Sequence, residues 1–196
     1  MSETTIPLFP LHAVLFPEGA LPLRIFESRY LDMISECLRT ECGFGVCLIR
    51  EGSEVGPAAK AYEVGTLSRI SYWHKRKDGL LGVTAVGEQR FRILDQEVRT
   101  NQVTVARVAL IENEPAAALP EKHQPLADFL REIMAQLGPP HTTRPQRLDD
   151  AGWVGGRLCE LLPLPLSQKQ YLLQLSDPLE RLDRLAEMLR ELAIRR

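Results

Sequence analysis

Four prolines and a glycine break up the first apolar stretch of this chain, and they restrict its fold more than any other feature. The turn-forming residues are Pro7, Pro10, Pro17, Gly19 and Pro22. Proline removes a backbone donor and clashes with the preceding helical turn, so residues 6–25 cannot form a helix. The apolar segments 6–9 and 21–25 are instead predicted to be short strands joined by tight turns.

A single helix is predicted next, over residues 28–40. Ser28 can cap its N-terminus, and Gly43 is suited to end it. Its apolar residues recur at helical spacing and therefore share one face. The residues of that face are Tyr30, Ile34, Cys37 and Leu38.

Five further strands are predicted over residues 44–49, 62–73, 80–86, 91–98 and 103–111. Alternation in the second of these slips once at Gly65, which predicts a bulge there, and then resumes at Ile70 and Tyr72. Residues 75–79 form a polar connection with an Asp-Gly turn signal, and residues 87–90 form a second turn. Short strands with no helix between them favour a closed or half-closed antiparallel barrel.

The composition changes at residues 114–120, where alanine and proline dominate, and everything beyond has helical periodicity. We therefore predict two domains, a β-barrel with one helix at residues 1–114 and a bundle of three or four helices at residues 115–196. The fold class is α+β.

Local signals place the helices of the second domain. A helix with apolar residues on one face is predicted at 125–137, and another begins near residue 149 or 150. Ser167 and Asp177 are predicted caps of two more, because a glutamine or glutamate follows each cap three residues later. Gly155 and Gly156 weaken the second helix, so close helix packing is the expected reason for them.

The charge balance argues against a general nucleic-acid binder. The net charge is −2 and the sequence pI is about 6.1. Neither half of the chain is basic, so long-range attraction to nucleic acid or to an anionic membrane has no support. No stretch reaches the roughly 20 apolar residues of a membrane span, and the N-terminus lacks the features of a signal peptide. We therefore expect a cytoplasmic protein.

No group of residues with catalytic or metal-binding chemistry stands out. The chain has no glycine-rich phosphate loop, no nucleophile elbow and no histidine pair of a metalloprotease. Cys37, Cys42 and Cys47 have a C-x4-C-x4-C spacing that matches no zinc site. We therefore expect no catalytic residue, no metal and no cofactor, and a protein that is not an enzyme.

Three aromatic side chains are candidates for a binding site. Trp73 and His74 stand next to the basic run 75–77. They form either a small binding edge or, as we favour, the exposed end of a hairpin. Trp153, in the helical domain, is a candidate for the lining of an apolar concave surface.

Two arginines complete the set of candidates. Arg90 and Arg92 are expected on the strand face opposite Phe91. They could grip a carboxylate or a backbone group of a partner, although a cross-strand ion pair on the barrel wall is the commoner arrangement.

Together these passages resemble the N-terminal domain family of Lon protease. The opening block carries PLFP at 7–10, LFP at 15–17, LPL at 21–23, IFE at 25–27 and RY at 29–30. Gly65-Thr66 is similar to the glycine-led central strand of the family, and GEQRFRI at 87–93 to its G-x-x-R-F-x-I segment. KQYLL at 169–173, with Asp177 and Glu180-Arg181-Leu182, resembles its helical part.

The resemblance implies a PUA-like pseudo-barrel followed by a helical bundle. In Lon, this region engages protein substrates and assists assembly, whereas the ATPase and the Ser-Lys protease lie further along. The sequence ends at Arg196, so we expect a stand-alone binding domain without either. The prolines and Gly19 of the opening block are interpreted as setting the path of the chain, not as a ligand motif.

The leading hypothesis is therefore a module that binds unfolded or degron-like polypeptide segments in protein quality control, by side-chain burial and strand addition. Self-association and a separate ATPase or protease as partner stay open. The alternative is RNA binding, since other PUA-like barrels contact RNA; the balanced charge argues against it. An enzyme acting on a small molecule has the least support, because no titratable pair stands at motif spacing.

Overall fold

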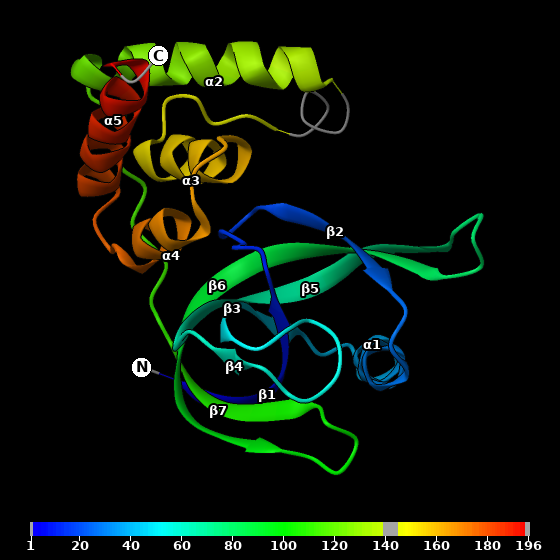
Figure 1. Cartoon of the computed structure of the whole chain (residues 1–196). Coiled ribbons are helices and arrows are strands. Elements are labelled where there is room, and N and C mark those ends of the chain that lie inside the picture. Colours follow the sequence, from blue (N-terminus) through cyan, green and yellow to red (C-terminus); the bar gives the residue numbers. More distant parts are fainter. Residues whose placement is uncertain (1, 139–144, 195–196) are drawn as a thin grey trace. The chain divides into compact units, whose positions relative to one another are not determined.

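The computed structural model describes residues 2–138 and 145–194, and the chain divides into two compact units, 1–113 and 114–196 (Figure 1). The first unit is rich in strands, and the second consists of helices. The division falls one residue earlier than the predicted boundary. Glu114, whose carboxylate binds the guanidinium of Arg181, belongs to the second unit.

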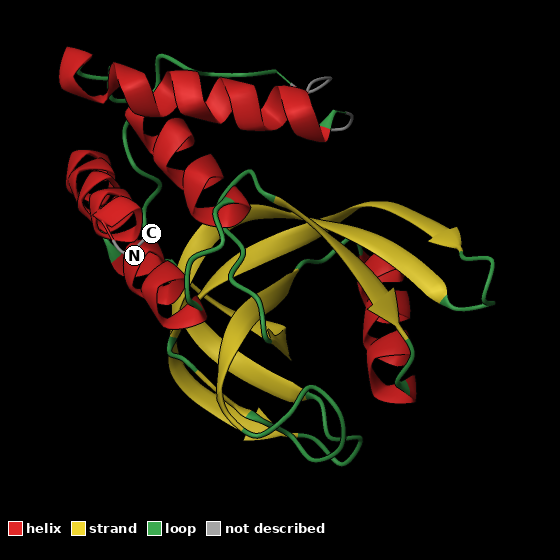
Figure 2. Cartoon of the chain, turned by 45° about the horizontal axis from the view of Figure 1, so that its top comes forward, coloured by secondary structure: helices red, strands yellow, loops and turns green. Residues whose placement is uncertain are grey.

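A curved sheet and one helix make up the first unit (Figure 2). Its elements are β1 (Glu3–Leu11), β2 (Ala20–Ile25), α1 (Ser28–Thr40), β3 (Phe44–Glu51), β4 (Lys60–Ala61), β5 (Val64–Lys75), β6 (Leu81–Val98) and β7 (Thr104–Leu110). All strand pairs are antiparallel except β1–β3, which is parallel. Because β1 pairs with both β7 and β3, the order β1-β7-β6-β5-β3 closes into a ring, and β2 adds to β6 outside it.

The predicted turn at residues 87–90 is wrong, because β6 runs without interruption through this segment. Glu88 is instead the extra residue of a bulge, since Gln89 pairs with Leu67 and Gly87 pairs with Ser68. A Cβ atom on Gly87 would lie 2.3 Å from the carbonyl oxygen of Phe16. The glycine is therefore required by a segment of chain that crosses β6, not by a turn.

The bulge predicted at Gly65 is also misplaced. Gly65 pairs regularly with Phe91, and the irregularity in this part of β5 lies between Ile70 and Tyr72, at Ser71. An extra residue there reverses the alternation that follows it. Tyr72 therefore lies on the opposite face of the sheet from Ile70, contrary to the expected pattern.

The length of α1 was predicted correctly, but both of its ends differ from expectation. Glu27, not Ser28, occupies the N-cap position, and no side chain bonds there. At the other end Glu41 adopts the left-handed conformation (φ 54°) in place of a glycine, and the Cys42 N–H donates to the Cys37 carbonyl. This is the hydrogen bond of a Schellman motif, which ends the helix before Gly43.

The core of the first unit joins α1 to the sheet. Tyr30, Ile34 and Cys37 are buried as predicted, whereas Leu38 of the same predicted face is 37% exposed. The Tyr30 ring stacks on Phe9 of β1 with ring centroids 4.1 Å apart. A smaller apolar group lies between β1, β3, β6 and β7. The helix therefore covers one side of the ring of strands.

The thiols provide a direct check on this packing. Burial raises the pKa of Cys47 and Cys159 to about 12, and burial together with the neighbouring Cys42 thiol raises that of Cys37 to about 12. Since Cys42 is the one exposed thiol of the four, we expect a single fast reaction per chain with Ellman's reagent at pH 8. Unfolding should release the other three, and Cys42→Ser should remove the fast reaction. Two fast thiols in the native wild type would contradict the end of α1 described here.

The second unit contains a 3-10 turn, η1 (Glu121–His123), and the helices α2 (Gln124–Leu137), α3 (Ala151–Leu161), α4 (Leu166–Gln174) and α5 (Pro178–Ile194). Asp150 caps α3 by accepting from the Trp153 N–H at 2.8 Å. Asp177 caps α5 as predicted, by accepting from the Leu179 N–H at 2.8 Å. Ser167 is not a cap: α4 begins one residue before it, after Pro165.

A buried arginine ties the second unit together. Arg181 of α5 donates from Nη1 to Glu114 Oε2 (2.8 Å), and its Nη2 binds the other carboxylate oxygen. Its remaining donors reach the carbonyls of Leu172 (3.0 Å) and Leu175 (2.6 Å) at the end of α4. A Cβ atom on Gly155 would lie 3.4 Å from Arg181 Cδ. This is an ordinary van der Waals distance, so the packing reason predicted for a glycine is not seen at Gly155.

Candidate functional site

The first unit contains a groove of about 330 Å³ beside β2, bounded by the end of β1 and the start of α1. We call it the β2 groove. Its lining consists of Phe9, Leu11, Ala13, Leu21, Pro22, Leu23, Arg24, Ile25, Phe26, Glu27, Tyr30 and Glu54. The lining is therefore mostly apolar, with three charged side chains among twelve residues.

Strand pairing explains the apolar wall of this groove. Leu21 and Leu23 pair with Ala85 and Val83 of β6 and face the core with them. Directly paired residues of antiparallel strands point to the same face of a sheet. Both leucines stay partly exposed, however, and Phe26 at the end of β2 has 53% of its surface exposed. The groove thus offers apolar surface that the unit does not bury.

The outer edge of β2 is another feature of the groove. The Gly87 N–H donates to the Gly19 carbonyl. Because hydrogen-bonded and non-hydrogen-bonded pairs alternate along antiparallel strands, the residues of β2 that bond to β6 are Leu21, Leu23 and Ile25. The backbone of the residues between them points away from β6, and no other described strand pairs with β2. Pro22 stands at the middle of this edge, where its missing N–H costs no sheet hydrogen bond.

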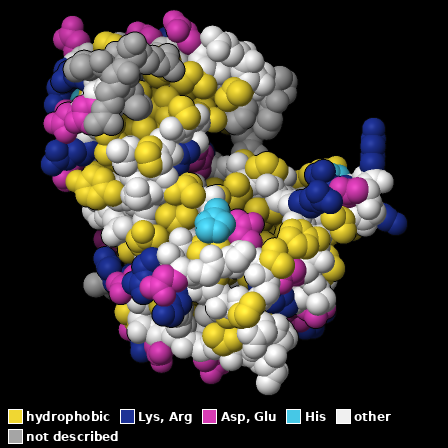
Figure 3. Space-filling model, in the orientation of Figure 1, with side chains coloured by type: hydrophobic (Ala, Val, Ile, Leu, Met, Phe, Trp, Pro, Cys, Tyr) yellow, Lys and Arg dark blue, Asp and Glu magenta, His cyan; other side chains and the backbone are white. Residues whose placement is uncertain are grey.

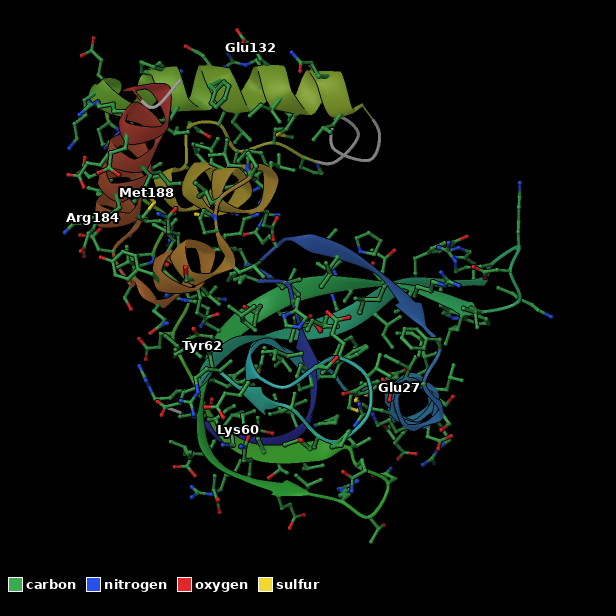
Figure 4. All side chains as sticks on the ribbon, in the orientation of Figure 1. Glu27, Lys60, Tyr62, Glu132, Arg184 and Met188 are labelled. Carbon is green, nitrogen blue, oxygen red and sulfur yellow. The ribbon has the colours of Figure 1, made fainter. Side chains whose placement is uncertain are left out.

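A buried arginine holds the segments around the groove. Arg29 of α1 is 6% exposed. Its guanidinium donates to the carbonyls of Gln102 (3.1 Å) and Glu54 (3.2 Å), and its Nε lies 3.0 Å from the Glu27 carboxylate. The same guanidinium lies 4.5 Å from the centre of the Tyr30 ring. Arg29 therefore joins the start of α1, the loop after β3 and the β6–β7 turn; Figure 4 labels Glu27 where β2 leads into α1.

The charged and titratable groups of the groove are engaged in these contacts. Glu27 pairs with Arg29, and Glu54 Oε1 accepts from the His12 N–H at 2.6 Å. Burial raises the pKa of the Tyr30 phenol, partly offset by Arg29, so the phenol is uncharged near pH 7. The described lining contains no histidine or cysteine, and no group of three potential metal ligands occurs in the described residues. The groove therefore presents mostly apolar side chains, and its two carboxylates are already held by neighbouring groups.

The predicted aromatic candidates lie away from the lining. Trp73 pairs with Val83 and so lies on the face of the sheet that carries Leu23, where it is 58% exposed. His74 stacks on Tyr72, with ring centroids 5.3 Å apart, on the other face. Trp153 is almost buried in α3 of the second unit. Of these, Trp73 alone shares a sheet face with the groove.

The two arginine candidates differ from each other. Arg90 is buried, whereas Arg92 is exposed and its Nη1 lies 3.6 Å from Glu63. Buried in this way, Arg90 is not exposed for the contact with a partner that was considered for both arginines. Arg92 makes the ion pair that was considered the commoner arrangement.

Except for Glu54, the lining of the groove comes from the opening block, whose prolines and Gly19 were predicted only to set the path of the chain. Its apolar residues were recognised as a strand, but nothing local shows that one edge of this strand stays unpaired. Pro22 does indicate an unpaired edge in the sequence, because a proline within a strand is confined to edge strands.

Comparison with known proteins supports the resemblance of this block. A profile described as the ATP-dependent protease La (LON) substrate-binding domain matches residues 5–191. The chain belongs to this family. The part of Lon that it matches is the substrate-binding domain, not the ATPase or the protease.

Relatives of the Lon substrate-binding domain family agree along nearly the whole chain. The Lon protease of Anaeromyxobacter dehalogenans is 26% identical over 192 residues, which cover 94% of this chain and 23% of the relative. Lon protease 2 of Myxococcus xanthus is 27% identical with the same coverage. The chain thus spans about a quarter of the length of these relatives.

Solved structures of the family show the same fold. The crystal structure of a Lon N-terminal domain protein from Xanthomonas campestris has a TM-score of 0.79 at 39% identity and covers 94% of this chain and 98% of that one. The N-terminal domain of a Mycobacterium avium complex Lon protease has a TM-score of 0.64 at 15% identity, with 94% and 97% covered. Within the described residues, no helix has the length and apolar character needed to cross a membrane.

Proposed function

We propose that this protein binds unfolded or degron-like polypeptide segments in the β2 groove, as a non-catalytic recognition module of protein quality control. The observation that carries the proposal is the apolar surface of Leu21, Leu23 and Phe26, which the first unit leaves partly exposed. Membership in a family described as a substrate-binding domain supports it.

The size of the groove favours short apolar segments as ligands. About 330 Å³ lies at the lower end of the range for ligand pockets. It therefore admits a few side chains of an extended chain rather than a folded surface. Folded proteins bury such side chains, whereas unfolded segments expose them, so burial in the groove discriminates between the two states.

The edge of β2 gives such a segment a partial backbone partner. The carbonyls of Ala20, Pro22 and Arg24 point away from β6, but Pro22 contributes no donor. A bound segment can therefore form only an interrupted ladder, and apolar burial supplies most of the affinity. Such weak dependence on backbone pairing suits a module that accepts many sequences.

Substitution of Phe26 tests the proposal. Full burial of a phenylalanine is worth about 1.5–3 kcal/mol, and every 1.4 kcal/mol changes affinity about tenfold. Since Phe26 is half exposed before binding, we expect Phe26→Ser to weaken binding of a fluorescently labelled, permanently unfolded protein by about fourfold to fifteenfold in a titration by fluorescence anisotropy.

Val98→Ser is the matched control, since Val98 is exposed to the same degree on β6 and lies outside the lining. It should leave the affinity within about twofold of wild type. An equal loss of affinity in the two variants would contradict the groove as the binding site. Equal binding of the folded and unfolded forms of the probe would contradict the proposed function.

A further inference from the structure

A cluster of basic side chains lies at one end of the β2 groove. Arg24 belongs to the lining, and 58% of its side chain is exposed. Its Nε is 3.5 Å from Oδ2 of Asp78 in the turn between β5 and β6, so the tip of this hairpin stands beside the groove. Figure 3 shows Lys and Arg side chains gathered at the hairpin tip next to hydrophobic ones.

This tip carries a local excess of positive charge. Arg24, Lys75, Arg76 and Lys77 contribute four cations against the single anion Asp78, a net charge of +3 on a chain whose total is −2. Asp78 Oδ2 is shared, because it also lies 3.3 Å from Arg76 Nε. Lys75 and Lys77 have no ion-pair partner among the described residues. The Asp78 carboxylate is thus shared by the guanidinium groups of Arg24 and Arg76. Within the described residues, the ammonium groups of Lys75 and Lys77 can therefore pair with a ligand.

The rest of the groove does not cancel this charge. Glu27 is neutralised by its contact with the buried Arg29, and the Glu54 carboxylate accepts a backbone N–H of His12. Arg29 also donates to the Glu54 carbonyl, which places its positive charge near both carboxylates. The groove therefore has a nearly neutral apolar interior and a positive end.

We propose that the β2 groove selects polypeptide segments in which a short apolar run is flanked by aspartate or glutamate, with the carboxylates held by Arg24 and the hairpin tip. This inference rests on the proposed function and names the ligand class for the same site. The Debye length of about 8 Å at physiological ionic strength corresponds to two or three residues of extended chain. The acidic residues must therefore lie within about that distance of the apolar run.

A polypeptide fits these observations better than a nucleic acid. The basic side chains stand at the end of an apolar groove whose wall is built from leucine and phenylalanine, whereas RNA would need a continuous basic track along its backbone. The stacked pair of Tyr72 and His74 lies on the other face of the hairpin from Leu23 and Val83. Arg24 lies on that same face, since it pairs with Gly82, which pairs with His74, so the apolar wall alone favours a polypeptide.

Three labelled peptides with one apolar centre test the inference. The centre is flanked on both sides by glutamate, glutamine or lysine, and dissociation constants are measured by anisotropy at 50 and 300 mM NaCl. At low salt we expect the glutamate peptide to bind about threefold tighter than the glutamine peptide and at least tenfold tighter than the lysine peptide. The differences should shrink severalfold at 300 mM NaCl, because salt screens exposed charges.

Matched charge variants locate the effect. Lys75→Gln with Lys77→Gln should reduce the preference for the glutamate peptide over the lysine peptide at least threefold and leave the affinity for the glutamine peptide unchanged. Arg50→Gln with Arg99→Gln removes the same charge from exposed positions of the first unit outside the groove, and it should preserve the preference.

Three other results of the peptide titrations would contradict the charge preference, the proposed function or the polypeptide as occupant. Equal binding of the three peptides would overturn the charge preference and leave the proposed function standing, whereas binding of none would overturn the proposed function as well. Displacement of the glutamate peptide by an equal concentration of a single-stranded RNA would overturn the assignment of a polypeptide as the occupant.

Discussion

Replacing Arg29 with methionine is expected to lower the free energy of unfolding of the first unit by about 3 kcal/mol. The substitution leaves the carbonyls of Gln102 and Glu54 without their buried donor, and each such loss costs about 1–3 kcal/mol. It also leaves the Glu27 carboxylate without its cation. Removing one partner of a buried ion pair costs about 3–5 kcal/mol, and the partial exposure of Glu27 puts this case at the low end.

The same helix provides the matched control. Arg39 is largely exposed and pairs with Glu36 one turn away, so Arg39→Met should cost less than about 1 kcal/mol. Arg29→Lys should recover only the part of the loss that comes from the Glu27 carboxylate, since one ammonium keeps the charge but cannot span carbonyls on two different segments. Urea unfolding followed by far-UV circular dichroism measures all three. Equal stability of the Arg29 and Arg39 variants would contradict the role assigned to Arg29.

Loss of Arg29 should also reduce peptide binding. Glu27, Tyr30 and Glu54 all line the groove, and Arg29 contacts each of them from behind. Under conditions in which the Arg29→Met variant is still folded, we therefore expect its affinity for an unfolded polypeptide to fall at least fivefold. Arg39→Met should bind like wild type. Unchanged binding by the folded Arg29 variant would show that the groove keeps its form without this contact.

In the second unit, replacing Arg181 with methionine should cost about 3–5 kcal/mol, because it removes the guanidinium that pairs with the Glu114 carboxylate and donates to two carbonyls at the end of α4. Trp153 of α3 is nearly buried, so its emission should shift to longer wavelength when this unit unfolds. Trp73→Phe removes the other tryptophan and makes the signal specific to the second unit.

A double-mutant cycle separates the ion pair from packing. Glu114→Met alone should cost a similar amount, since it leaves the guanidinium buried with two carbonyl acceptors and no anion. Replacing both residues with methionine should recover at least about 1 kcal/mol relative to the sum of the single changes, because neither charge is then left alone. Additive losses would show that the two side chains contribute independently.

Local chemistry accounts for the parts of the fold that were predicted correctly. The bounds of α1 follow from apolar spacing, and the start of α5 follows from Asp177 and Pro178, whose capping interactions lie within three residues. Ser28 and Ser167 carry the same kind of signal but do not cap, because Ser28 is already the first residue of α1 and Ser167 the second residue of α4. Cap chemistry alone does not choose between neighbouring positions.

Contacts between distant segments account for the errors in the sheet. Gly87 has the composition of a turn, yet it lies within a continuous strand, since Phe16 packs against it from 71 residues away. Likewise the bulge at Ser71 sets which of Tyr72 and Trp73 faces the groove side of the sheet, and periodicity placed it at Gly65. Bulge positions depend on the partner strand, which a local pattern does not contain.

The sequence by itself therefore determined the family, the order of strands and helices, and the expectation of a binding module without catalytic groups. It did so because turn residues, apolar periods and motif spacings are local properties of the chain. The tertiary structure alone supplied the surface at which we propose that binding occurs. An unpaired edge of β2, partly exposed leucines and a basic hairpin tip beside Arg24 arise only once β2 joins β6 and the hairpin stands beside it. Exposure is a property of what the rest of the chain leaves uncovered, and no single segment encodes it.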